Sequence, residues 1–87
     1  MITILNKGGL LIMKTFNIQL NSINDVKLFV NTVSSYSCDI DLTSGRYVVD
    51  AKSIMGIFSL DLSKPIKVEI FSDDCEQLMK ELEKFMV

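Results

Sequence analysis

Apolar and polar residues alternate in three short segments of this chain, and the alternation predicts β-strands. The segments are residues 14–20, 37–42 and 65–72. A period of two places the apolar side chains on one face of a strand and the polar ones on the other. Residues 46–50 follow a Thr-Ser-Gly turn and return beside 37–42. We therefore expect a hairpin within a sheet that has one buried face.

Two longer segments place apolar residues three or four positions apart and predict α-helices. The first covers about residues 24–35 and is preceded by Ser22, a hydroxyl N-cap, with the carboxylate of Asp25 three residues on. The second follows Asp73 and Asp74, whose charges suit a helix N-terminus. The apolar stripe of the first helix comprises Ile23, Val26, Phe29, Val30 and Val33, and that of the last comprises Cys75, Leu78, Met79, Leu82, Phe85 and Met86.

A third, short helix is expected between the hairpin and the last strand. Gly56 interrupts the segment AKSIMGIFSLDL, so only one or two turns are predicted, starting near Ser53. The element order is then β-α-β-β-α-β-α. This order predicts an α+β domain with one mixed or antiparallel sheet, whose apolar face the helices cover.

The first twelve residues are expected to stand apart from this domain. Lys7-Gly8-Gly9 can be encoded by AAA-GGA-GG, a bacterial ribosome-binding sequence, and Met13 follows closely. We therefore expect residues 1–12 to be a non-native or disordered extension and residues 13–87 to be the folded domain. The extension lacks the features of a signal peptide and is too short to span a membrane.

Composition excludes several classes of function. The 87 residues include no histidine, which excludes imidazole as base, phosphoryl acceptor or metal ligand, and 9 basic against 11 acidic residues argue against nucleic acid as a partner. Cys38 and Cys75 are expected to be reduced, mostly buried thiols of a cytoplasmic protein. Asp39 and Asp41 share one strand face, and with no third oxygen ligand apparent we expect a solvated face, no metal and no cofactor.

One segment of the chain carries a family resemblance. Lys52-Ser53-Ile54-Met55-Gly56, followed by Phe58-Ser59-Leu60, closely resembles the regulatory-site segment of HPr, the small phosphocarrier of the bacterial sugar phosphotransferase system. The resemblance extends from Lys14-Thr15-Phe16 to the last predicted helix. It implies an open-faced two-layer sandwich, in which a four-stranded antiparallel sheet of order 1-4-2-3 carries all helices on one face.

The chain departs from the family where working phosphocarriers bind the phosphoryl group. Their loop before the first helix contains Gly-x-His-Ala-Arg-Pro-Ala, in which the His is the acceptor. Here the stretch is shorter and reads Ser22-Ile23-Asn24-Asp25-Val26-Lys27, without His or Arg. Phosphoryl relay needs a nitrogen nucleophile held at helix amides. An acyl phosphate on Asp25 is chemically conceivable, but we expect this carboxylate to cap the helix, and we expect no catalytic residue.

Ser53 is the candidate regulatory site. In Gram-positive members of the family the matching serine is phosphorylated by an ATP-dependent kinase, and the product binds a transcriptional regulator, so the resemblance implies such partners here. A phosphoserine suits a helix N-terminus, but an unmodified serine is also a good N-cap, and both interpretations stay open. Lys52 is either a phosphate contact or a solvated side chain.

Ile54, Met55 and Phe58 are the candidate partner-binding residues. The family exposes apolar side chains at matching positions, and a flexible Met beside an aromatic ring suits an adaptable protein contact. Only one side of a single helical turn can face the sheet, so one or two of these residues would instead be core. We expect Met55 and Phe58 to be the exposed ones.

Three functions remain open. We favour a non-catalytic HPr-like regulatory or adaptor protein of the cytoplasm, which serine phosphorylation would switch and which is not an enzyme. One alternative is an ordinary phosphocarrier, which the missing His contradicts. The other is a structural module that binds proteins without phosphorylation. The sequence leaves the identity of the partner and the oligomeric state open.

Overall fold

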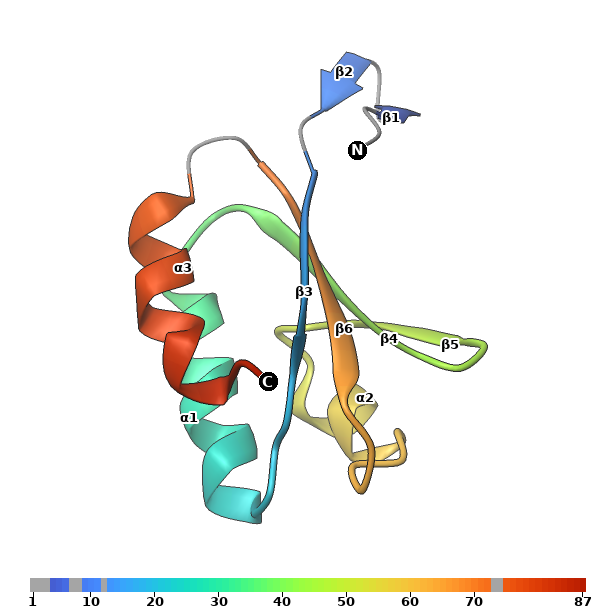
Figure 1. Ribbon diagram of the computed structural model, residues 1–87, viewed down its shortest axis with the longest axis vertical. Helices are drawn as coiled ribbons and strands as arrows, with labels where there is room; N and C mark the ends of the chain where they lie inside the picture. Colours follow the sequence, from blue (N-terminus) through green and yellow to red (C-terminus); the bar gives the residue numbers. More distant parts are fainter. Residues whose placement is uncertain (1–3, 7–8, 12, 73–74) are drawn as a thin grey trace.

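A four-stranded antiparallel sheet forms the centre of the computed structural model, which describes residues 4–6, 9–11, 13–72 and 75–87. Its strands are β3 (Met13–Ile18), β4 (Asp39–Ser44), β5 (Tyr47–Asp50) and β6 (Ile66–Phe71). They lie in the order β3-β6-β4-β5, and every neighbouring pair is antiparallel (Figure 1). Counted along the chain from β3, this is the order 1-4-2-3 that the family resemblance implied.

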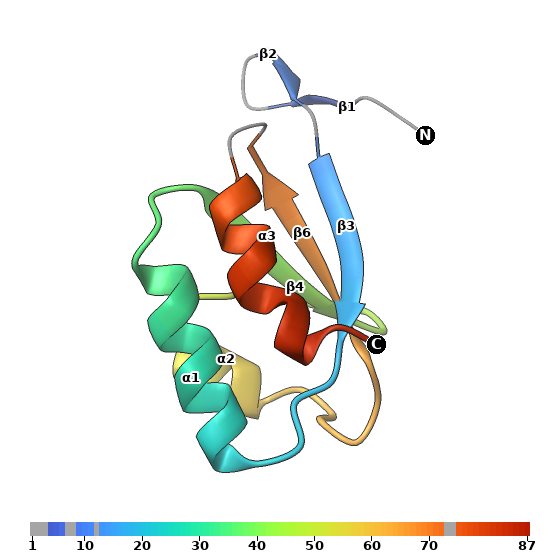
Figure 2. The same ribbon diagram turned by 60° about the vertical axis from the view of Figure 1, so that its left-hand side comes forward.

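The helices lie on one side of this sheet (Figure 2). α1 (Ile23–Ser34) runs beside α3 (Glu76–Leu82), which the 3₁₀ turn η1 (Glu83–Phe85) extends. The short α2 (Ile54–Phe58) contacts both α1 and β5. The predicted α+β class and the order β-α-β-β-α-β-α are therefore confirmed. None of the helices that the structure describes combines the length and apolar character needed to cross a membrane.

The core fills the space between the sheet and the helices. On β6, Ile66, Val68 and Ile70 are buried, whereas Lys67 is exposed on the opposite face, as the alternation predicted. The rings of Phe29 and Phe85 meet edge to face with centroids 5.7 Å apart, which ties α1 to the end of the last helix. The other buried side chains are Ile18, Leu20, Val26, Val33, Ile40, Leu42, Ala51, Ile57, Leu60, Cys75, Leu78 and Leu82.

The predicted boundaries are close to those observed, and one predicted core residue is exposed. β3 ends at Ile18, although Leu20, which was expected in this strand, is still buried. Ile23 was expected on the apolar stripe of α1 but is 64% exposed. The reason is its position, because it is the first residue of the helix and borders an open groove instead of the sheet.

The chain following η1 lies against the outer edge of β3. The Val87 N–H donates to the Asn17 carbonyl oxygen at 3.1 Å. The Gln19 N–H donates to the Phe85 carbonyl oxygen at 2.8 Å. These bonds satisfy backbone groups at the C-terminal end of β3. As an edge strand, β3 would otherwise be open there to pairing with another chain.

Two expectations fall on the margins of the described residues. Ile4–Asn6 (β1) and Gly9–Leu11 (β2) pair with each other in a separate two-stranded sheet. That residues 1–12 stand outside the natural domain stays a prediction. Asp73 and Asp74, expected at the start of the last helix, lie outside the described residues.

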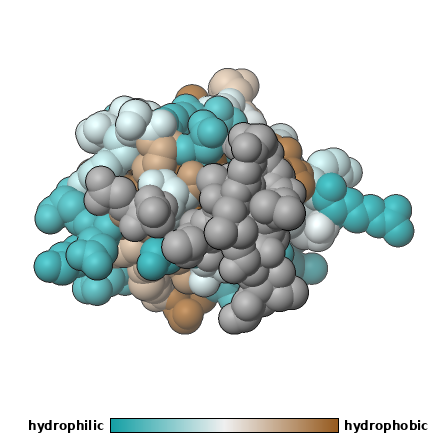
Figure 3. Space-filling model, turned by 90° about the horizontal axis from the view of Figure 1, so that it is seen from above, coloured by the Kyte–Doolittle hydropathy of each residue, from teal (hydrophilic) through white to brown (hydrophobic). Residues whose placement is uncertain are grey.

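Seen from above, polar side chains cover much of the visible rim of the molecule, with apolar ones between them (Figure 3).

Candidate functional site

Ser53 is the N-cap of α2 and lies at the surface. Its Oγ accepts a hydrogen bond from the Gly56 N–H at 3.2 Å, and its own N–H donates to the Asp50 carbonyl oxygen at 3.0 Å. The backbone at Ser53 is extended and the residue is exposed. The hydroxyl is therefore at once a helix cap and a group that an enzyme can reach.

Gly56 allows α2 to pack closely against β5. A Cβ atom at this position would lie 3.2 Å from the Ser53 Oγ and 3.2 Å from the Val49 Cβ. Both distances are tighter than ordinary van der Waals contact. The missing side chain thus lets the short helix sit against the strand while Ser53 keeps its capping bond.

Lys52 is not a freely solvated side chain. Its Nζ donates to the Tyr36 carbonyl oxygen at 2.6 Å, and its backbone N–H donates to Asp50 Oδ1 at 2.9 Å. Tyr36 lies just beyond α1, where carbonyl groups lack helical partners and a cation is favoured. The ammonium group therefore already has an acceptor in the unmodified protein, and a role in contacting phosphate stays a prediction.

The single turn of α2 divides its apolar side chains between core and surface. Ile57 is fully buried and Ile54 packs partly buried against the core, whereas Met55 is 76% and Phe58 41% exposed. The exposure predicted for Met55 and Phe58 is confirmed. That these side chains bind a partner stays a prediction.

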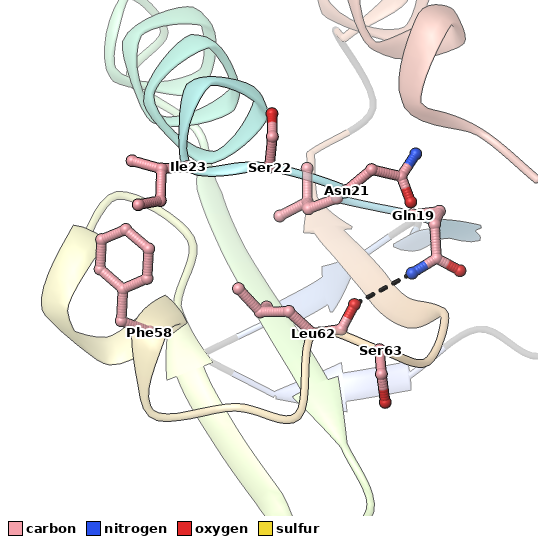
Figure 4. A pocket seen from close by; sticks show the side chains of 8 residues that line it. Gln19, Asn21, Ser22, Ile23, Phe58, Leu62 and Ser63 are labelled. Carbon is pink, nitrogen blue, oxygen red and sulfur yellow. Dashed lines mark hydrogen bonds between the residues drawn. The ribbon is translucent and has the colours of Figure 1, made fainter.

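A groove of about 580 Å³ separates the N-terminus of α1 from the end of α2. Ile23 and Phe58 lie close to one another along its rim, and Gln19 Nε2 donates to the Leu62 carbonyl oxygen at 3.1 Å (Figure 4). Sequence reasoning missed Gln19 and Leu62, because 43 positions separate them and no local pattern signals that the fold joins them. The complete lining is Gln19, Leu20, Asn21, Ser22, Ile23, Phe58, Leu62 and Ser63.

The N-terminus of α1 is closed by its own side chains. Ser22 Oγ accepts a hydrogen bond from the Asp25 N–H at 3.1 Å, which confirms Ser22 as the N-cap. Asp25 Oδ2 in turn accepts a hydrogen bond from the Asn21 N–H at 2.9 Å, one residue earlier than a standard capping box. Asn24, the third residue of the replaced loop, is exposed in the first turn. A carboxylate thus already complements this helix terminus.

Tyr36 links α1 to α3 and has an altered acidity. Its hydroxyl donates to Glu81 Oε2 at 2.5 Å. This hydrogen bond to Glu81, followed by desolvation and the nearby negative charge, raises the pKa of Tyr36 to about 12. The phenol therefore stays protonated well above the usual range for tyrosine.

The remaining candidates form no further site. Cys38 is half-buried, and Cys75, the residue before α3, is buried. Asp39 and Asp41 lie on the open face of the sheet, away from the helices. Among the described residues, no group of three or more His, Cys, Asp or Glu is arranged to hold a metal ion.

Comparisons with known proteins agree on one family. The model of the PTS HPr component phosphorylation site matches residues 24–87. The crystal structure of HPr-C-His from Thermoanaerobacter tengcongensis is 34% identical, covers 84% of this chain and 88% of that chain, and superimposes with a TM-score of 0.67. A phosphocarrier protein HPr from Bacillus anthracis str. Ames is 25% identical, covers 88% of this chain and 98% of that chain, and has a TM-score of 0.66. The family match begins at Asn24, after the loop that precedes α1.

Proposed function

The chain belongs to the HPr family, and we propose that it is a regulatory or adaptor protein of the phosphotransferase system and not a working phosphocarrier. It would act in the bacterial cytoplasm by binding other proteins and would itself catalyse no reaction. The observation that carries the proposal is the contrast between two helix N-termini. Both caps, Ser22 and Ser53, are exposed and accept a helix N–H, but the first turn of α1 contains the carboxylate of Asp25, whereas the first turn of α2 contains no acidic residue.

Loss of the phosphocarrier step is supported by the chemistry around α1. The chain has no histidine, and the groove beside this helix is lined by amide, hydroxyl and apolar side chains. An amide nitrogen is not nucleophilic, and a serine ester of phosphate lacks the transfer potential of a phosphoramidate. Asp25 is held in its capping bond and adds negative charge where a phosphoryl donor would approach.

Retention of the regulatory step is supported by the geometry around Ser53. An HPr-type kinase would transfer the γ-phosphoryl group of ATP to Ser53 Oγ, releasing ADP and the hydroxyl proton. The new group would add about two negative charges to the surface at the start of α2. A partner such as a transcriptional regulator would then distinguish the two forms.

The docking surface we propose consists of Ile54, Met55 and Phe58, with Ile23 beside it. Met55 is the most exposed of these side chains, and Ile23 continues the apolar surface from α2 to the start of α1. Ser53 directly precedes the single turn of α2 that carries Ile54, Met55 and Phe58. One partner can therefore contact both the serine and the docking surface. Modification of Ser53 would therefore change the charge at the border of an apolar contact.

Intact mass spectrometry after incubation with ATP and an HPr kinase tests the proposal. We expect a gain of one phosphate that Ser53→Ala abolishes. Ser59→Ala is the matched control, because Ser59 is an exposed serine at the other end of the same helix, and it should leave the gain unchanged. No gain in the unsubstituted protein would leave Ser53 as a helix cap only and would favour the purely structural module.

A further inference from the structure

Tyr36 connects the three helices at one point. Its carbonyl oxygen, just past α1, accepts a hydrogen bond from Lys52 Nζ at 2.6 Å in the turn before α2. Its hydroxyl donates to Glu81 of α3 at 2.5 Å, and its ring packs against the core. The residue next to Ser53 is thus joined to α3 through a single tyrosine.

The bond from Lys52 is open to competition because its acceptor is neutral. A hydrogen bond between an ammonium and an anion is about twice as strong as one between neutral groups. Asp50 Oδ1 accepts the backbone N–H of Lys52, while the Lys52 ammonium bonds to the Tyr36 carbonyl oxygen. An anion at Ser53 would be a new acceptor one residue away, within reach of the flexible lysine chain.

We propose that Lys52, Tyr36 and Glu81 form a relay that transmits negative charge at Ser53 to α3. The relay rests on the proposed function only in that phosphorylation would be the natural source of the charge. When Lys52 turns to the anion, the carbonyl of Tyr36 loses its donor at the end of α1. The tyrosine side chain is then held less firmly, and its bond to Glu81 weakens.

Through the relay, phosphorylation of Ser53 would act on α3 as well as on the docking surface. The docking surface on α2 borders Ser53 directly, whereas Glu81 lies on α3, across the helical layer (Figure 2). Local coupling energies of this kind change local opening equilibria by small factors, which amide hydrogen exchange resolves. The amides to watch are those of Ser35 and Tyr36, which donate to the carbonyls of Thr32 and Val33, and those around Glu81.

Hydrogen exchange measured by NMR on Ser53→Asp and Ser53→Asn tests the relay. Both residues are good N-caps of nearly equal shape, so the pair differs in charge alone. We expect about threefold faster exchange at these amides in the Asp variant than in the Asn variant. In a Lys52→Met background the two should exchange alike. Tyr36→Phe should retain the charge response at the end of α1 and lose it in α3.

Equal exchange in the two Ser53 variants would overturn the relay, as would slower exchange in the Asp variant or a difference that persists without Lys52. If Lys52→Met does not fold, as judged by circular dichroism, Lys52→Gln provides the same test. None of these proteins requires a kinase. Failure of the relay and failure of Ser53 to be phosphorylated are therefore separate results.

Discussion

At the scale of single residues, the N-termini of α1 and α2 share the same kind of cap and differ in the acidic residue of the first turn. At the start of α1, Ser22 Oγ accepts the Asp25 N–H, and the Asp25 carboxylate accepts the N–H of Asn21 in the preceding loop. Ser53 caps α2 in the same way, and a carboxylate, Asp50, again bonds to the N–H of the preceding residue, Lys52, but this carboxylate precedes α2 and the first turn of the helix contains no acidic residue. A phosphate on the cap would therefore meet a carboxylate in the first turn of α1 but none in the first turn of α2.

Replacing the α1 cap should destabilise the protein. Ser22→Ala removes the acceptor for the Asp25 N–H, and we expect a loss of about 1 kcal/mol in the free energy of unfolding. Urea unfolding followed by circular dichroism measures this. Ser22→Asp, which can still cap, is the control and should lose much less. Equal losses in the two variants would show that the capping bond is not the cause.

The bond between Tyr36 and Glu81 predicts a dependence of stability on alkaline pH. The pKa of Tyr36 is about 12 in the folded protein and near 10.0 when unperturbed. The stabilisation is thus fully present below pH 10 and is lost as the pH rises toward about 12, because the unfolded chain releases the phenolic proton first. Between pH 9 and pH 11, the free energy of unfolding should decrease more for the unsubstituted protein than for Tyr36→Phe. Parallel pH profiles would contradict the prediction.

At the scale of elements, periodicity predicted β3, β4, β6, α1 and α3, whereas β5 and α2 were predicted from a turn and from Ser53 and Gly56. Contacts across the fold could not be predicted from such local patterns. Alternation predicted the buried face of β6, and spacing predicted the buried residues Val26, Phe29 and Val33 of α1 but wrongly added Ile23, which is exposed. No periodic signal reports that Lys52 reaches a backbone carbonyl 16 positions away, or that Gln19 meets Leu62. Such contacts depend on how whole elements pack, so the groove and the relay required the structure.

The turn between β4 and β5 requires a glycine. Gly45 has a φ of 60°, a conformation that costs L-amino acids about 1–2 kcal/mol. Gly45→Ala should lower the free energy of unfolding by about 1 kcal/mol or more, although a Cβ there meets no atom within 4 Å. Gly45→Asn should lose less, since Asn tolerates this region. Denaturant unfolding of both variants measures these losses. An unchanged midpoint for Gly45→Ala would show that backbone strain at this position does not limit stability.

At the scale of the whole molecule, the sheet separates two surfaces of different character. The helical side carries Ser53, the exposed apolar residues of α2 and the groove beside Ile23. The open side carries the polar residues that alternate with the core, such as Asp39 and Lys67. We therefore expect partner proteins to contact the helical side at the end where α2 meets the start of α1.

A pair of substitutions on the two sides tests this assignment. Met55→Asp places a charge in the proposed docking surface, and we expect about tenfold slower phosphorylation of Ser53 by an HPr kinase at limiting substrate. Val48→Asp is the matched control, because Val48 is 60% exposed and lies on β5 away from that surface. Its rate should stay within about twofold of the unsubstituted protein. Similar rates for both variants would place the contact elsewhere.

The most direct test of the proposed function compares two phosphoryl donors on the same protein. Intact mass is measured after incubation with ATP and HPr kinase, and separately after incubation with phosphoenolpyruvate and enzyme I. A regulatory protein without a phosphocarrier centre should gain one phosphate from ATP, lost in Ser53→Ala, and none from phosphoenolpyruvate. A phosphate gained from phosphoenolpyruvate, or none gained from ATP, would contradict it.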